Sequence, residues 1–191
     1  MPGPLEVLLD FTLVLAELGI QYVVVGSFAS SARGFQRATR DVDILAKIGL
    51  EQVESIYERL TGRYYVDRLS IRSAVLNRSH FNAIHLASMF KVDVFVPSDS
   101  DRLSQQQLNR HLPEKLSPDS DAIVYMATAE DTLLAKLIWY RKGHQVSDRQ
   151  WADVLGIIRL QGERLDLVYL EDWAAQLGLT ELLNRALDEV R

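Results

Sequence analysis

Asp41 and Asp43 are the residues of this sequence whose types and spacing are best suited to chemistry. They open the aliphatic run 41–45, where strand alternation would place both carboxylates on one face and Val42 and Ile44 on the other. Two adjacent carboxylates repel each other unless something positive lies between them. Oxygen ligands of this kind suit Mg²⁺ or Mn²⁺ rather than zinc. The pattern therefore predicts a divalent-metal site.

A third acid, Asp93, lies inside an otherwise apolar run at 91–96 that alternates like a strand. Aspartate is depleted from strands and costly to bury alone, so this carboxylate needs a partner. The partner is either a metal or a cation such as Lys91. We favour the metal, because Asp41 and Asp43 already require one.

A small-residue turn precedes the acids, where the apolar run 22–25 ends at Gly26 and Ser27. A buried strand that ends in glycine and a hydroxyl residue is suited to bringing backbone N–H groups and a helix N-terminus to a phosphate. Arginines suited to bidentate phosphate contacts lie between this turn and the acids. They are Arg33, Arg37 and Arg40.

Gly-Ser, a short helix and Asp-x-Asp on the next strand together resemble the signature of the nucleotidyltransferase superfamily that includes DNA polymerase beta. The run Arg-Ala-Thr-Arg-Asp-Val-Asp is similar to the abortive-infection (AbiEii-like) toxin branch of that superfamily. The resemblance implies an α+β fold, with a mixed β-sheet core flanked by helices and then a C-terminal helical subdomain. It also implies an enzyme that moves a nucleoside monophosphate from a triphosphate to an acceptor hydroxyl and releases pyrophosphate.

The same resemblance assigns roles to the acids. Asp41 and Asp43 would bind two Mg²⁺ or Mn²⁺ ions that stabilise the attacking and leaving oxygens. Asp93 would be the third metal ligand, on the acceptor side, and could take the hydroxyl proton.

For the nucleotide, the resemblance points to Gly26 and Ser27 as the residues that hold the terminal phosphates, together with Arg40. Lys136 lies in a run that is apolar nearly all round, so its ammonium needs a phosphate, a carboxylate or a route to water. Relatives of the toxin branch carry a lysine in the first helix after the core, which points Lys136 at the nucleotide.

Those relatives also carry Arg-Asp-x-x-Asp on the following helix. The matching positions here are Arg149, Gln150 and Asp153, so the first aspartate is missing. The missing aspartate argues against an acid–base role for this motif, and the alternative is that Arg149 and Asp153 form a simple i,i+4 pair.

The remaining reactive residues are expected to be structural. The other Asp-x-Asp pairs, Asp99 with Asp101 and Asp119 with Asp121, lie among serine and proline, where aspartates cap turns and helices. The four histidines show no ligand spacing. A second arginine cluster is expected to be solvated on surface elements; it comprises Arg63, Arg68, Arg72 and Arg78.

Composition and length point to a globular protein. The chain has 191 residues, 48% of them hydrophobic, a net charge of −5 and no cysteine. The charge argues against a broad basic face for nucleic acid, and the lack of cysteine fits a reducing cytoplasm. No apolar run reaches membrane-spanning length and no signal peptide is evident, so we expect a cytoplasmic protein without a membrane partner.

Periodicity predicts a mixed core at 1–126 and a packed helical subdomain at 127–191. Strands are expected at 20–25, 41–46, 63–66, 81–86 and 91–96, with a final edge strand at 122–126. Helices are expected at 4–18, 27–33, 50–60, 102–111, 129–142, 147–160, 166–177 and 180–190.

The acceptor is not fixed by the sequence and could be an RNA end, a protein side chain or a small molecule, with the toxin-like pattern favouring the first two. A cognate antitoxin is a further candidate partner. Two other functions remain open. One is a non-catalytic nucleotide- or protein-binding member of a toxin–antitoxin or defence pair, and the other is a metal-dependent phosphohydrolase.

Overall fold

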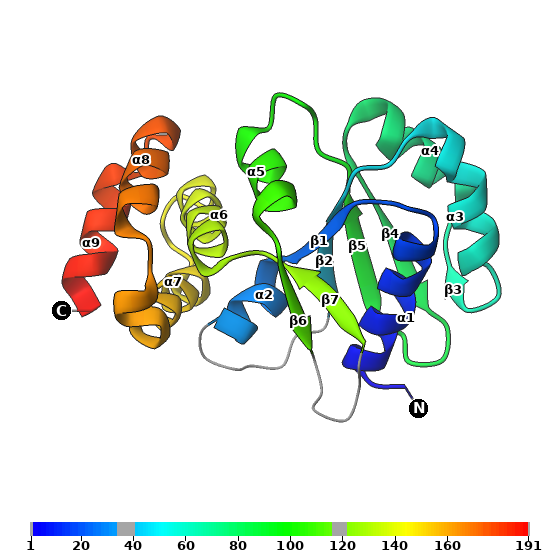
Figure 1. Ribbon diagram of the computed structural model, residues 1–191, viewed down its shortest axis with the longest axis horizontal. Helices are drawn as coiled ribbons and strands as arrows, with labels where there is room; N and C mark the ends of the chain where they lie inside the picture. Colours follow the sequence, from blue (N-terminus) through cyan, green and yellow to red (C-terminus); the bar gives the residue numbers. More distant parts are fainter. Residues whose placement is uncertain (1, 34–40, 116–121, 191) are drawn as a thin grey trace. The chain divides into compact units, whose positions relative to one another are not determined.

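The computed structural model describes residues 2–33, 41–115 and 122–190 (Figure 1). The chain divides into two compact units. The first is formed by Met1–Val25 and Thr39–Ala127, and the second by Gly26–Ala38 and Thr128–Arg191. Of the predicted site residues, Arg40 lies outside the described residues, as do Arg37, Asp119 and Asp121.

The first unit is built on a seven-stranded mixed sheet in the order β3-β4-β5-β2-β1-β7-β6. The β2–β5 and β1–β7 pairs are parallel, and the other neighbouring pairs are antiparallel. This mixed sheet with flanking helices confirms the predicted α+β class. The strands are β1 (Tyr22–Val25), β2 (Asp41–Ala46), β3 (Tyr64–Tyr65), β4 (His80–His85), β5 (Lys91–Phe95), β6 (Leu112–Lys115) and β7 (Ile123–Met126).

One face of the sheet is buried along the central strands, because alternate residues there are aliphatic. Val42 and Ile44 of β2 and Val92 and Val94 of β5 have no exposed surface. The helices of this unit that pack with one another and with β4 and β7 are α1 (Pro4–Glu17), α3 (Val53–Leu60) and α4 (Arg68–Asn77). Burial of these side chains supplies the main stabilisation of the unit.

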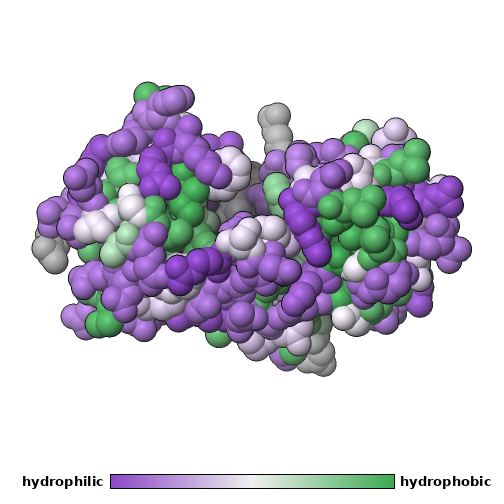
Figure 2. All heavy atoms as spheres, turned by 90° about the horizontal axis from the view of Figure 1, so that it is seen from above, coloured by the Kyte–Doolittle hydropathy of each residue, from purple (hydrophilic) through white to green (hydrophobic). Residues whose placement is uncertain are grey.

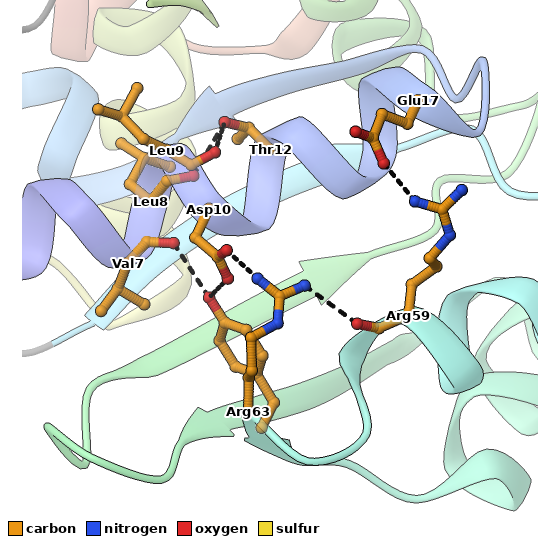
Figure 3. Close-up of polar contacts among 9 residues, drawn as sticks. Val7, Leu8, Leu9, Asp10, Thr12, Glu17, Arg59 and Arg63 are labelled. Atoms are coloured by element: carbon orange, nitrogen blue, oxygen red, sulfur yellow. Dashed lines mark hydrogen bonds and ion pairs between the residues drawn. The ribbon is translucent and has the colours of Figure 1, made fainter. Parts of the chain in front are cut away.

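Polar contacts fasten α1 to the neighbouring elements (Figure 3). The Tyr64 hydroxyl of β3 lies 2.9 Å from Asp10 Oδ2 and 3.2 Å from the Val7 carbonyl oxygen. Arg63 pairs with the same Asp10 carboxylate. Burial, and then the hydrogen bond with Asp10, raise the pKa of Tyr64 above its usual range. This buried tyrosine and its aspartate therefore fix where α1 lies on the sheet.

The opposite face is covered in part by α5 (Arg102–Arg110). Leu108 packs there with Val23, Val25 and Leu45 in one apolar cluster. Asp101 caps α5 by accepting a hydrogen bond from the Ser104 amide at 3.2 Å, as expected for an aspartate before a helix.

The second unit is helical in its described residues. Thr128 and Ser147 cap α6 and α7 by accepting hydrogen bonds from the amides three residues later. Contacts link α2 with α6 and α7, α7 with α9, and α8 with α6 and α9. The helices are α2 (Gly26–Arg33), α6 (Ala129–Lys142), α7 (Asp148–Gln161), α8 (Leu167–Leu177) and α9 (Thr180–Val190), with the 3-10 turn η2 (Gly162–Arg164).

Two sequence-based expectations about the elements were wrong. The strand expected at the edge, β7, lies between β1 and β6. The edge on that side is β6, where no strand was expected. Pro113 in β6 explains this, because proline is tolerated only where a strand has an unpaired side. The helix expected at 50–60 begins instead with the 3-10 turn η1 (Leu50–Gln52).

The surface mixes hydrophilic and hydrophobic patches. Figure 2 shows hydrophobic side chains gathered in patches with hydrophilic residues between them. Leu69 and Leu76 of α4 are among the exposed hydrophobic residues. In the part of the chain that the structure describes, no helix has the length and hydropathy needed to cross a bilayer.

Candidate functional site

Three carboxylates lie on the partly open face of the sheet, on the neighbouring strands β2 and β5. β2 and β5 run parallel, with Asp43 opposite Asp93 and Asp41 opposite Lys91. Residues paired across neighbouring strands project to the same side, so Asp41, Asp43 and Asp93 share one face. The buried aliphatic residues between them, such as Val42, point the other way. Strand alternation and the parallel register thus bring together acids that lie about fifty residues apart in sequence.

Lys91 provides the positive charge in this row. Its ammonium nitrogen lies 2.6 Å from Asp93 Oδ2. The hydrogen bond to Asp93 raises the pKa of Lys91, and the charges of Asp93, Asp41 and Asp43 add to the effect. Of the two partners that the sequence allowed for Asp93, the structure has the lysine.

The donor set fits a hard divalent cation in its chemistry, since all three side chains offer carboxylate oxygens. Their present arrangement is not a finished coordination shell. Among residues 2–33, 41–115 and 122–190, no three His, Asp or Glu side chains are grouped closely enough to hold a metal ion. The Lys91 ammonium contacts Asp93 Oδ2, one of the carboxylate oxygens that the row offers to a metal.

Strand β4 borders the acid row with residues that the sequence did not single out. Asn82 lies opposite Asp93, and Ile84 lies opposite Lys91. The His80 and Phe95 rings are tilted against each other with centroids 5.5 Å apart. Strands were expected at 81–86 and 91–96, but the register between them could not be inferred from these residues.

Gly26 and Ser27 form the first turn of α2, immediately after β1. Gly26 has a φ of 65°, a conformation that glycine adopts without strain. Val25, the residue before it, is the register partner of Asp43. The Ser30 hydroxyl donates a hydrogen bond to the Ser27 carbonyl at 3.0 Å, which keeps this turn compact.

Lys136 is buried inside the second unit and is paired with a carboxylate. Its nitrogen lies 2.8 Å from Asp153 Oδ2, with side-chain exposures of 5% and 11%. The Ser30 hydroxyl reaches the same oxygen at 3.5 Å. Of the three surroundings that the sequence left open for the Lys136 ammonium, the structure has a carboxylate. Ser30 was not singled out, because nothing in the sequence links it to α7.

Arg63 and Arg68 of the second arginine cluster are held by acids on the surface of the first unit. Arg63 pairs with Asp10, and Arg68 lies 3.3 Å from Glu54. His85 and His111 also make local contacts, His85 with the Ser88 hydroxyl at 2.8 Å and His111 with the Leu108 carbonyl at 2.6 Å. These contacts agree with structural roles for the four residues.

Comparisons of the fold identify nucleotidyltransferases as structural neighbours. The solution structure of the antibiotic-resistance factor ANT(2'')-Ia matches with a TM-score of 0.56 and 12% identity, over 95% of this chain and 97% of that one. The lincomycin-bound lincosamide antibiotic adenylyltransferase LnuA matches with a TM-score of 0.50 and 13% identity, over 80% and 95% of the two chains. An antigenic nucleotidyltransferase-like protein from Paracoccidioides brasiliensis matches with 0.54 and 15%, over 94% and 92%.

At these identities the similarity shows a shared fold. No family model matches the sequence, and no curated protein matches it. The chain therefore has the fold of nucleotidyltransferases, and its activity has to be argued from its own residues.

Proposed function

We propose that this protein is a metal-dependent nucleotidyltransferase, which moves a nucleoside monophosphate from a nucleoside triphosphate to an acceptor hydroxyl and releases pyrophosphate. The observation that supports this most strongly is the row of Asp41, Asp43 and Asp93 on one sheet face. The row occurs in a fold shared with nucleotidyltransferases. A fold alone would not support an activity, but the fold with three aligned carboxylates does.

In this proposal Asp41, Asp43 and Asp93 hold the divalent cation, Mg²⁺ or Mn²⁺. Bound there, the cation would polarise the phosphoryl oxygens and offset the negative charge that develops during transfer. Carboxylate oxygens without nitrogen or sulfur ligands match this preference.

The protein's own groups do the rest. The oxygen of the acceptor hydroxyl attacks the α-phosphorus, and the bond from that phosphorus to the pyrophosphate breaks. Asp93 takes the proton of the hydroxyl as it attacks. Gly26 and Ser27 bind the terminal phosphates through the first turn of α2, with Arg40 as a further cation. Lys136 is proposed to bind nucleotide as well, and its pairing with Asp153 would fix its side chain in one position.

The proposal is tested by incubating the protein with each α-³²P-labelled nucleoside triphosphate and Mg²⁺, in the presence of total RNA, total protein or a panel of hydroxyl-bearing antibiotics. Antibiotics belong in the panel because two proteins of this fold are named as antibiotic-resistance or antibiotic-modifying proteins. We expect one acceptor to become labelled, with one pyrophosphate released per label. Asp43→Asn should reduce transfer by at least about a hundredfold, because it removes one of the carboxylates proposed to hold the divalent cation.

The same assay separates the competing functions. A phosphohydrolase would release phosphate or a monophosphate without any acceptor. A non-catalytic protein would yield neither a labelled acceptor nor pyrophosphate, and this result would overturn the proposal.

The second candidate is a nucleotide- or protein-binding member of a toxin–antitoxin or defence pair, as the similarity to the abortive-infection branch suggests. Two observations favour it. Lys91 occupies an oxygen of the third acid, and Gln150 stands where that branch carries an aspartate. Nucleotide binding that survives in Asp43→Asn, with no turnover in either protein, would support this candidate.

A further inference from the structure

Lys91 is the feature of the acid row that the proposed function does not explain. Its ammonium contacts Asp93, and the register places it directly opposite Asp41. It therefore lies beside the very carboxylates that are proposed to bind metal.

The local charge explains why a cation is held there when no metal is bound. Three carboxylates share one face, and the side chain of Asp93 is only 13% exposed. A carboxylate with so little access to water is destabilising unless a positive group compensates it. Lys91 supplies one positive charge against three negative ones, which partly neutralises the row.

A divalent cation and the Lys91 ammonium compete for the Asp93 carboxylate, because the ammonium already contacts its Oδ2 and the two like charges repel each other at short distance. Lys91 has a flexible stem and a side chain that is 41% exposed, so its ammonium has access to water once it leaves Asp93.

We propose that Lys91 acts as an internal counterion for Asp41, Asp43 and Asp93 in the metal-free protein. A divalent cation must displace the Lys91 ammonium before the cation can bind Asp93. This inference rests on the proposed function, because it takes Asp41, Asp43 and Asp93 as the metal ligands. It adds a regulatory residue: Lys91 stabilises the free protein and weakens metal binding, so the site loads only at sufficient cation concentration or when a nucleotide brings its own metal.

The test is a direct measurement of Mn²⁺ binding in the absence of nucleotide. The electron paramagnetic resonance signal of free Mn²⁺ reports how much of the ion remains unbound. We expect Lys91→Met to bind Mn²⁺ about tenfold more tightly than the wild type, because a competing ion pair and a repulsive charge are both removed. Lys91→Arg keeps the charge and should bind no more tightly than the wild type. Lys47→Met is the matched control, since it removes an exposed lysine just after β2 and changes the net charge equally.

A second readout does not depend on metal binding. In EDTA, Lys91→Met should unfold at a lower temperature than Lys47→Met, and added Mn²⁺ should remove that difference. Equal Mn²⁺ affinities for the Lys91→Met and Lys47→Met proteins would overturn the inference. If Asp43→Asn at the same time lost Mn²⁺ binding, the proposed metal site would stand. Unchanged Mn²⁺ binding in Asp43→Asn would instead overturn the metal site and the inference together.

Discussion

At the scale of single residues, both units contain a lysine that is paired with an aspartate in a setting of low exposure. Lys91 pairs with Asp93 on the sheet, and Lys136 pairs with Asp153 between helices. The two pairs differ in their access to water, since the Lys91 side chain is partly exposed and the Lys136 side chain is almost completely buried. The first can therefore rearrange at low cost, whereas the second is fixed by its burial.

Lys136→Met should destabilise the second unit by about 3 kcal/mol, because it removes the ammonium that pairs with the buried Asp153 carboxylate. Asp153→Asn should have a similar effect by leaving the ammonium uncompensated. Urea unfolding followed by circular dichroism measures both.

The double variant Lys136→Met with Asp153→Leu is the informative control. Replacing both charges by apolar groups of similar size should restore most of the lost stability. A double variant as unstable as the sum of the two single variants would show that the pair is not the source of the effect.

The sequence predicted which face of the sheet the acids share better than it predicted which residues contact them. Alternation in an aliphatic run is a local property, so the shared face of Asp41 and Asp43 could be inferred directly. The contact of Asp93 with Lys91 depends on side-chain rotamers, which no local pattern determines. Likewise, the contact of Asp153 with Lys136 and Ser30 depends on the packing of α2, α6 and α7, which no local pattern encodes.

At the scale of elements, the contact of α1 with β3 depends on one buried phenol. Tyr64→Phe removes the hydroxyl that contacts Asp10 and the Val7 carbonyl, and should cost about 1 kcal/mol near neutral pH. Arg59→Gln is the control, because the exposed Arg59–Glu17 pair should contribute less.

The same tyrosine predicts a pH dependence. The folded protein raises the pKa of Tyr64 above its ordinary value of 10.0. Above that pH the unfolded chain loses the phenol proton while the folded protein retains it, so the contribution of Tyr64 to stability is complete below about pH 10 and falls at higher pH. Urea midpoints from pH 8 to 11 should fall less steeply in Tyr64→Phe than in the wild type. Parallel curves would contradict the prediction.

The stability of helix α6 should depend on Thr128, the residue that caps its N-terminus. The Thr128 side chain is buried and accepts a hydrogen bond from the Asp131 amide at 3.2 Å. Thr128→Ala should therefore lower the free energy of unfolding by about 1 kcal/mol, as for other N-cap losses. Thr128→Ser keeps the hydroxyl and should remain close to the wild type. Equal losses in both variants would point to packing of the methyl group instead.

The long elements were predictable because their signals are local. Leucine spacing with proline and glycine at the ends fixed α1, and capping residues fixed the starts of α6 and α7. The edge strand β6 escaped notice because Leu-Pro-Glu-Lys has neither alternation nor strand-forming residues. Its pairing with β7 is a tertiary effect, which short-range patterns do not record.

At the scale of the whole molecule, a segment near the N-terminus belongs to the second unit, and the chain after it belongs to the first unit again. Residues 26–38 group with 128–191, whereas the sequence predicted a simple division into 1–126 and 127–191. The reason is the packing of α2 against α6 and α7. The second unit is therefore not a contiguous piece of chain.

This connectivity predicts how fragments behave. A protein ending at residue 127 keeps the sheet and its apolar core, but α2 loses the helices that bury Ala29 and Ser30. An eight-residue helix is marginal in water without packing. We therefore expect residues 26–33 to exchange their amide hydrogens rapidly in fragment 1–127, while β1 and β2 stay protected.

Adding the separate fragment 128–191 should restore protection of 26–33, because α2 regains its contacts with α6 and α7. Hydrogen–deuterium exchange read by mass spectrometry distinguishes these segments. The control is a 128–191 fragment carrying Asp153→Lys, which places a second buried cation beside Lys136 and should restore protection less well. Full protection of 26–33 in fragment 1–127 alone would mean that α2 is held by the sheet unit, and that the chain divides near residue 127 after all.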